Sequence, residues 1–114
     1  MSDVRIISQI PELDALFERS RDKPVFLLKH SLTCPVSSRA HQEYGRFVAG
    51  RSDDEAEFLL LEVQNARPLS NEVAERTGIR HESPQALLVR DGRVVWHASH
   101  FQIRGDALEQ ALAT

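Results

Sequence analysis

The sequence predicts an α/β domain in which a central mixed β-sheet is flanked by helices. Short apolar runs typical of strands buried on both faces alternate with segments whose apolar residues recur at helical spacing. The last two apolar runs are separated by Asp91-Gly92, which is typical of a hairpin turn. The chain has 114 residues, the size of one domain, and no Gly/Pro/Ser-rich linker divides it, so we treat residues 1–114 as a single domain.

Two helices are expected in the first half of the chain, each with a proline near its start. Pro11 and Pro35 suit the first turn because the N–H that proline lacks would have no helical partner there. Gly50 ends the second helix. The expected elements are an edge strand Val4–Ile7, a helix Pro11–Ser20, a strand Val25–Leu28, a polar connection Lys29–Thr33 and a helix from Cys34-Pro35 to Ala49.

The second half of the chain predicts a strand, a helix, a hairpin and a last helix. Ser70 or Asn71 is the expected cap of the third helix, and Gly78 its stop. The expected elements are a strand Phe58–Val63, a helix Leu69–Thr77, strands Ala86–Val89 and Val94–Trp96, and a helix that begins at Gly105. Helices between early strands imply right-handed parallel crossovers, and the hairpin adds antiparallel strands. This order, β-α-β-α-β-α-β-β-α, is that of the thioredoxin fold.

Composition excludes several classes of function. The 14 basic and 17 acidic residues give a formal net charge of −3, and the basic residues are scattered. We therefore expect neither a nucleic-acid nor a membrane partner. No apolar run approaches the ~20 residues of a membrane helix. The first residues lack the basic and apolar regions of a signal peptide, which predicts a cytoplasmic protein.

The single cysteine, Cys34, is the candidate catalytic residue. One cysteine excludes an intramolecular disulfide and a zinc site built on several thiolates. It is then either a small buried hydrophobe or a reactive thiol. Polar Thr33 before it and Pro35 after it favour a helix start over the core. The free N–H groups at a helix start favour a negative atom, and they lower cysteine pKa values from about 8.5 to as little as ~3.5–7.5. A thiolate is the nucleophile of disulfide exchange.

Two further residues belong to the candidate site. Ser37 stands where a dithiol motif would hold a second cysteine, so a mixed disulfide on Cys34 cannot be resolved within the chain. Its hydroxyl could donate to the Cys34 sulfur or could bond to backbone in the first helical turn. Pro84, before the strand Gln85–Val89, is either an ordinary strand-boundary residue or, in a thioredoxin-like fold, a cis-proline facing the nucleophile. A cis bond would free the Ser83 backbone to pair with an extended thiol peptide.

Other polar residues are candidates for binding a small thiol. Lys29 and His30 end the strand before the motif and could lie near the thiolate or bind a carboxylate, or could be a solvated strand end. Glu82, beside Ser83, is a third candidate. His97 and His100 have a spacing that could serve a metal, but neither an acidic residue nor a thiolate is nearby in sequence, so we predict no metal site. Arg39 is expected on a solvated helix face.

Two segments carry a family resemblance. Phe26–Ser37, FLLKHSLTCPVS, resembles the Phe-Lys-His-Ser-x-x-Cys-Pro-Ile-Ser signature of the monothiol bacilliredoxins, the YtxJ-like proteins of the bacillithiol system. His81–Gln85, HESPQ, resembles the His-Glu-Ser-Pro-Gln segment of the same family. The similarity covers nearly the whole chain, and Val36 for Ile is a conservative exchange.

The resemblance implies a thioredoxin fold and the removal of bacillithiol, a glucosamine–malate–cysteine thiol, from S-bacillithiolated client proteins. Cys34 would attack the mixed disulfide and carry the bacillithiol until a second thiol regenerates it. Pro84 would be the cis-proline, and Lys29 is the first candidate to bind the malate or sugar. The residues expected to support the active site around Cys34 are Thr33, Pro35, Ser37, Ser83 and Pro84. No tightly bound cofactor is implied, and bacillithiol is a co-substrate. Glutathione or coenzyme A as the thiol, or a non-catalytic thioredoxin-fold binding module, remain alternatives.

Overall fold

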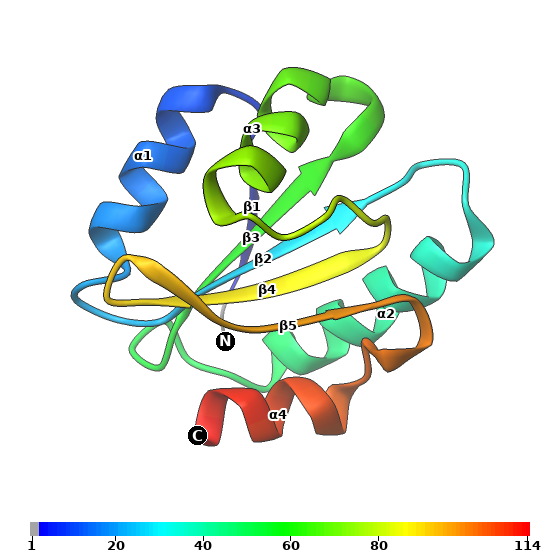
Figure 1. Ribbon diagram of the computed structural model, residues 1–114. Coiled ribbons are helices and arrows are strands. Elements are labelled where there is room, and N and C mark those ends of the chain that lie inside the picture. The colour runs from blue at the N-terminus through cyan, green and yellow to red at the C-terminus, as the bar shows by residue number, and fades with distance from the viewer. Residues whose placement is uncertain (1–2) are drawn as a thin grey trace.

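The computed structural model describes residues 3–114 and confirms each predicted helix and strand (Figure 1). Two short 3-10 helices, η1 and η2, were not predicted. The elements in chain order are β1 Val4–Ile6, α1 Ile10–Arg19, β2 Val25–His30, α2 Pro35–Ala49, β3 Glu57–Glu62, η1 Val63–Asn65, α3 Arg67–Thr77, β4 Gln85–Arg90, β5 Arg93–Ser99, η2 His100–Gln102 and α4 Gly105–Ala113. None of the described helices is long and apolar enough to cross a membrane.

The five strands form one mixed sheet in the order β1-β3-β2-β4-β5. The strands β1, β3 and β2 are parallel, whereas β4 runs antiparallel to β2 and β5 antiparallel to β4. Because β2 and β3 are parallel neighbours, their carboxyl ends meet at the same edge of the sheet. This edge therefore brings the loop after β2 beside the segment after β3.

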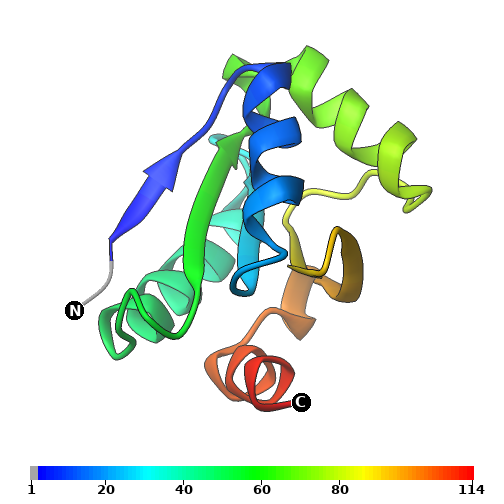
Figure 2. The same ribbon diagram turned by 90° about the vertical axis from the view of Figure 1, so that its left-hand side faces the viewer.

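Helices cover both faces of the sheet, with α1 and α3 on one side and α2 and α4 on the other (Figures 1 and 2). Alternate residues of β2 enter the two cores: Phe26 and Leu28 pack toward α2 and α4, and Val25 and Leu27 toward α1 and α3. All of these side chains are buried. The continuous apolar run thus reflects a central strand with two buried faces, as its sequence predicts.

Several predicted boundaries were wrong. Lys29 and His30 were assigned to a polar connection but belong to β2, where they pair with Leu61 and Glu62 of β3. The third helix begins at Arg67 with Ala66 as its N-cap, so the predicted caps Ser70 and Asn71 lie inside the helix. Pro68 causes this shift, because a proline fits the first helical turn. Gly78 ends that helix with a φ of 73°, as predicted.

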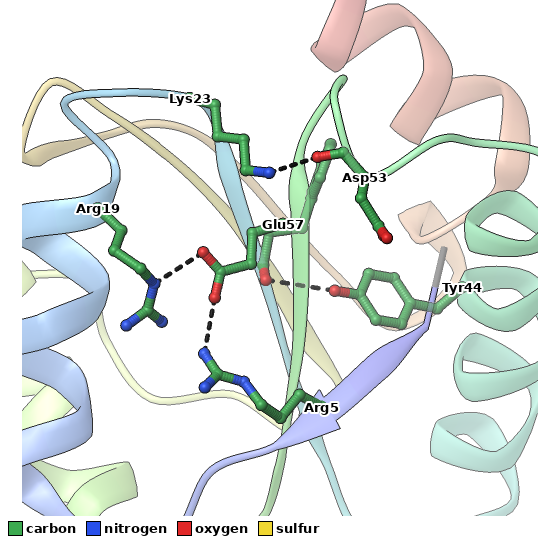
Figure 3. Close-up of polar contacts among 7 residues, drawn as sticks. Arg5, Arg19, Lys23, Tyr44, Asp53 and Glu57 are labelled. Carbon is green, nitrogen blue, oxygen red and sulfur yellow. Dashed lines mark hydrogen bonds and ion pairs between the residues drawn. The ribbon is translucent and has the colours of Figure 1, made fainter. Parts of the chain in front are cut away.

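The amino ends of β2 and β3 are held by charged and polar side chains (Figure 3). The Glu57 carboxylate accepts hydrogen bonds from Arg5 at 2.7 Å and from Arg19 at 2.8 Å. Lys23 donates to the Asp53 carbonyl across the same end of the sheet. Beside them the buried Tyr44 hydroxyl donates to the Leu59 carbonyl at 2.9 Å. These contacts join β1, α1, α2 and β3 at the end of the sheet opposite the loop that carries Cys34.

Candidate active site

Cys34 is the N-cap of α2, with Pro35 in the first turn, as the sequence predicts. Its backbone is extended, with φ −103° and ψ 122°, and its carbonyl accepts the Ser38 N–H at 3.0 Å. Cys34 is partly exposed, and its side chain makes no capping hydrogen bond. An N-cap side chain lies where it can accept from the second or third N–H of the helix, here Val36 or Ser37. A thiolate at this position therefore meets unpaired donors and the positive end of the helix dipole.

The Ser37 hydroxyl links α2 to the end of β2. Its Oγ is buried, accepts the Ser31 N–H at 2.8 Å and lies 2.8 Å from Nδ1 of His30. Neither of the two predicted roles describes this arrangement. In the described structure the hydroxyl bonds neither to the Cys34 sulfur nor to backbone of its own helical turn. Ser37 instead fixes the start of the loop that precedes Cys34.

The His30 ring is buried, so the prediction of a solvated strand end was wrong for this residue. It lies between Ser37 and the ring of His41, whose centroid is 4.5 Å away. Burial and then the His41 charge lower the pKa of His30, while Glu62 opposes this shift. The net effect favours the neutral form of the His30 ring. Its tautomer decides whether Nδ1 donates to the Ser37 oxygen or accepts the Ser37 hydroxyl hydrogen.

Lys29 is also buried, so the prediction of a solvated strand end was wrong for this residue as well. Its side chain is 0% exposed, and Nζ donates to the Ser70 carbonyl of α3 at 3.3 Å. Alternation along β2 turns it toward α1 and α3, so its side chain does not reach solvent. Burial lowers the pKa of Lys29 to about 8.

The peptide bond between Ser83 and Pro84 is cis, as the thioredoxin-like reading predicts. Gln85 pairs with Lys29, which places the buried Pro84 beside the carboxyl end of β2. The Pro84 carbonyl accepts the His100 N–H at 3.1 Å, so η2 is joined to this peptide. The Ser83 Oγ atom is buried without a hydrogen-bond partner in the described residues.

Gln64 belongs to the site but was missed in the sequence. Its side-chain amide accepts the Leu32 N–H at 3.0 Å and donates to Ser31 Oγ at 2.9 Å and to Thr33 Oγ1 at 3.4 Å. It lies in η1, directly after β3. The sequence offered one indication of this role: Gln64 follows a predicted strand, and the carboxyl end of that strand lies beside the carboxyl end of β2.

The remaining candidates lie around this edge of the sheet or on the last hairpin. Glu82 is partly buried, and its charge raises the pKa of His81, against the larger lowering by burial and by Lys29. Arg39 is exposed, with its guanidinium 5.9 Å from the ring centroid of the exposed Phe101. His97 and His100 are exposed, and residues 3–114 contain no group of three His, Cys, Asp or Glu side chains arranged for a metal.

Comparison with known families identifies the chain. The model of the family described as monothiol bacilliredoxin BrxC matches residues 5–108. The chain belongs to the monothiol bacilliredoxin family. Membership agrees with the single cysteine and confirms the resemblance found in the sequence.

Solved structures confirm the thioredoxin fold of this bacilliredoxin. A protein described as a candidate oxidoreductase with a thioredoxin fold superposes with a TM-score of 0.84 at 35% identity, covering 95% of this chain and 92% of the other. Thioredoxin from Malassezia sympodialis gives 0.78 at 16% identity, covering 99% and 90%. Thioredoxin from Fasciola hepatica gives 0.76 at 13%, covering 96% of both chains. The family and the first of these structures together support a thiol redox enzyme.

Proposed function

We propose that this protein is a monothiol thiol–disulfide oxidoreductase that removes bacillithiol from S-bacillithiolated proteins in the cytoplasm. One observation carries the proposal: in a chain of the bacilliredoxin family, the lone cysteine is the N-cap of α2, at the edge of the sheet that also holds cis-Pro84. A lone reactive thiol with no intramolecular partner suits a reducing compartment.

The reaction has two exchange steps. The Cys34 thiolate attacks the bacillithiol sulfur of the client mixed disulfide, so a bond between Cys34 and bacillithiol forms as the client sulfur leaves as a thiolate and takes a proton. The client cysteine is thereby reduced and Cys34 is oxidised. A second, external thiol then attacks the bacillithiol sulfur on Cys34. This releases a low-molecular-weight disulfide and returns the Cys34 thiolate.

The residues of this chain position the nucleophile but do not resolve the mixed disulfide that it forms. The first-turn N–H groups of α2 stabilise the negative sulfur before attack and after regeneration. Ser37 contributes an oxygen where a dithiol enzyme has its second sulfur, so each cycle depends on the external thiol. Because Lys29 is buried, recognition of the malate carboxylates falls to groups that reach solvent, and Glu82, which carries a negative charge, is a poor partner for them.

The proposal is tested with a client protein loaded with bacillithiol through one disulfide. Mixing with the reduced enzyme is expected to release the free client thiol and to leave a single bacillithiol adduct on Cys34, detected by mass spectrometry. Parallel clients carrying glutathione or coenzyme A identify the preferred thiol. If the client thiol is released faster from a glutathione or coenzyme A mixed disulfide, that thiol, and not bacillithiol, is the preferred substrate.

A binding module without turnover gives a different result. It would show no adduct on Cys34 and no release with any of the three clients. Cys34→Ser would then recover the same partners from cells as the wild type.

A further inference from the structure

The loop that carries Cys34 is held by a side chain that takes no part in the exchange chemistry. Residues 31–33 connect the last residue of β2 to the N-cap of α2. The Gln64 amide bonds to each of these three residues, through one backbone N–H and two hydroxyls. Gln64 reaches them because β3 ends beside β2 at the same edge of the sheet (Figure 1).

The orientation of this amide is fixed by its partners. Oε1 faces the Leu32 N–H, a donor, so the oxygen must lie on that side. Nε2 has two hydrogens, and two hydroxyl oxygens accept from them, Ser31 Oγ at 2.9 Å and Thr33 Oγ1 at 3.4 Å. A reversed amide would place its NH2 group against the Leu32 N–H and leave the Oε1 atom facing the hydroxyls. The Leu32 N–H therefore selects one of the two orientations of the Gln64 amide.

The start of the helix needs such a support because the N-cap side chain provides none. Cys34 makes no capping hydrogen bond, so its own side chain does not fix its extended backbone. Ser37 fixes Ser31 at the first residue of the loop. Leu32 and Thr33, the two residues next to Cys34, are bonded by Gln64. Leu32 is 46% exposed, so packing does not hold it in place.

We propose that Gln64 is a positioning residue for the nucleophile, whose amide holds the loop that places Cys34 at the N-terminus of α2. The proposal rests on the proposed function only in taking Cys34 as the nucleophile. Without the Gln64 contacts the loop can move, and Cys34 is held less firmly at the positive end of the α2 dipole. The thiolate then loses stabilisation, and alkylation at neutral pH slows.

The test measures the pH dependence of Cys34 alkylation by iodoacetamide, which reports on the thiol whatever its biological substrate is. For Gln64→Ala we expect the midpoint of the profile to move up by about half a unit to one unit, which makes alkylation roughly 3–10-fold slower below the midpoint. Gln64→Met keeps the length of the side chain without its polar atoms and should behave in the same way. Hydrogen exchange of the Leu32 amide, which Gln64 protects, is expected to accelerate in both variants.

Asn65→Ala is the matched control. This neighbouring amide is exposed and bonds to Glu62 rather than to the loop, so its loss should leave the alkylation profile unchanged. The proposal is overturned if both Gln64 variants keep the wild-type profile, or if Asn65→Ala shifts it equally. Gln64→Met decides the question alone if Gln64→Ala does not fold. Failure of bacillithiol release with a shifted alkylation profile would reject the proposed function and leave this inference standing.

Discussion

At the amino ends of β2 and β3 polar side chains meet as opposite charges, whereas at the carboxyl ends they meet mostly as neutral hydrogen-bonding groups. Glu57 lies between Arg5 and Arg19 at the first end. At the second end, the Ser37 hydroxyl bonds to Nδ1 of His30. Ser37 and Gln64 both bond to Ser31, the first residue of the loop before Cys34. The charge buried at this end is Lys29, whose partner is a carbonyl rather than a carboxylate.

Under the proposed function, this difference follows from the chemistry at the carboxyl end. A nucleophilic thiolate is negative before attack and neutral as a mixed disulfide. A carboxylate bonded into its loop would disfavour the negative form, and an ammonium there would compete with the helix N–H groups. Neutral hydrogen bonds hold the loop equally well in both states of the sulfur. The amino end has no such constraint and can use ion pairs.

The largest effect on client release is expected from removing the Cys34 sulfur, the atom that changes charge during exchange. Cys34→Ser should reduce release of a thiolated client to the uncatalysed background and abolish the adduct. The fold should be retained, because serine is a good N-cap and can add up to about 1 kcal/mol of stability at this position. Client release and thermal unfolding check the two parts. Residual catalysed release in this variant would mean that the chemistry lies elsewhere.

A large loss of stability is expected from Ser37→Ala. It leaves the buried Nδ1 of His30 and the partly buried Ser31 N–H without their partner, which costs about 1–3 kcal/mol. Because the lost hydrogen bonds are neutral, this cost should not change with salt. Urea unfolding at low and high salt measures both. Ser38→Ala, at an exposed neighbouring site, is the control, and a similar loss there would contradict this role for Ser37.

Local patterns were sufficient to predict the fold. The apolar runs, Pro11 and Pro35 near helix starts, and the Asp91-Gly92 turn identify the elements and their order. The position of Cys34 also followed from local sequence, since an N-cap and a first-turn proline are adjacent residues. The cis bond before Pro84 needed the fold as well, because most bonds before proline are trans.

The remaining parts of the site depend on contacts between distant segments. Lys29 and His30 have the polarity of a strand end, yet β3, β4 and the helices on both faces bury them. Nothing near Lys29 in sequence shows that α3 covers it. Gln64 is more than thirty residues from the loop that it bonds, and its role depends on the parallel pairing of β2 with β3. Single-sequence patterns contain no information on these distances.

The buried lysine predicts a smaller effect that depends on pH. Folding lowers the pKa of Lys29 from 10.5 to about 8, so the unfolded chain binds more protons between these values. Wild-type stability should therefore rise with pH across this window relative to Lys29→Met, which has no charge to bury. The shift corresponds to about 3 kcal/mol at neutral pH. Loss of the hydrogen bond from Nζ to the Ser70 carbonyl offsets about 1.5 kcal/mol of this, so Lys29→Met should be more stable by about 1–2 kcal/mol. Urea unfolding of both proteins across this pH range measures the difference, and parallel curves would show that the Lys29 charge costs nothing.

The smallest effect on stability is expected at the amino ends of β2 and β3. It tests whether ion pairs hold this end, in contrast to the neutral hydrogen bonds at the carboxyl ends. Glu57→Gln removes the negative charge between Arg5 and Arg19 but keeps an oxygen that can accept a hydrogen bond. Both arginines are partly exposed, so the loss should be about 0.5–1 kcal/mol and should shrink as salt screens the pairs. The same urea experiment used for Ser37→Ala measures it. If the loss of stability does not change with salt concentration, Glu57 acts through hydrogen bonding. The two ends of the sheet would then be held by the same kind of interaction. Cys34 alkylation should match the wild type, because Glu57 and the Cys34 loop lie at opposite ends of the sheet.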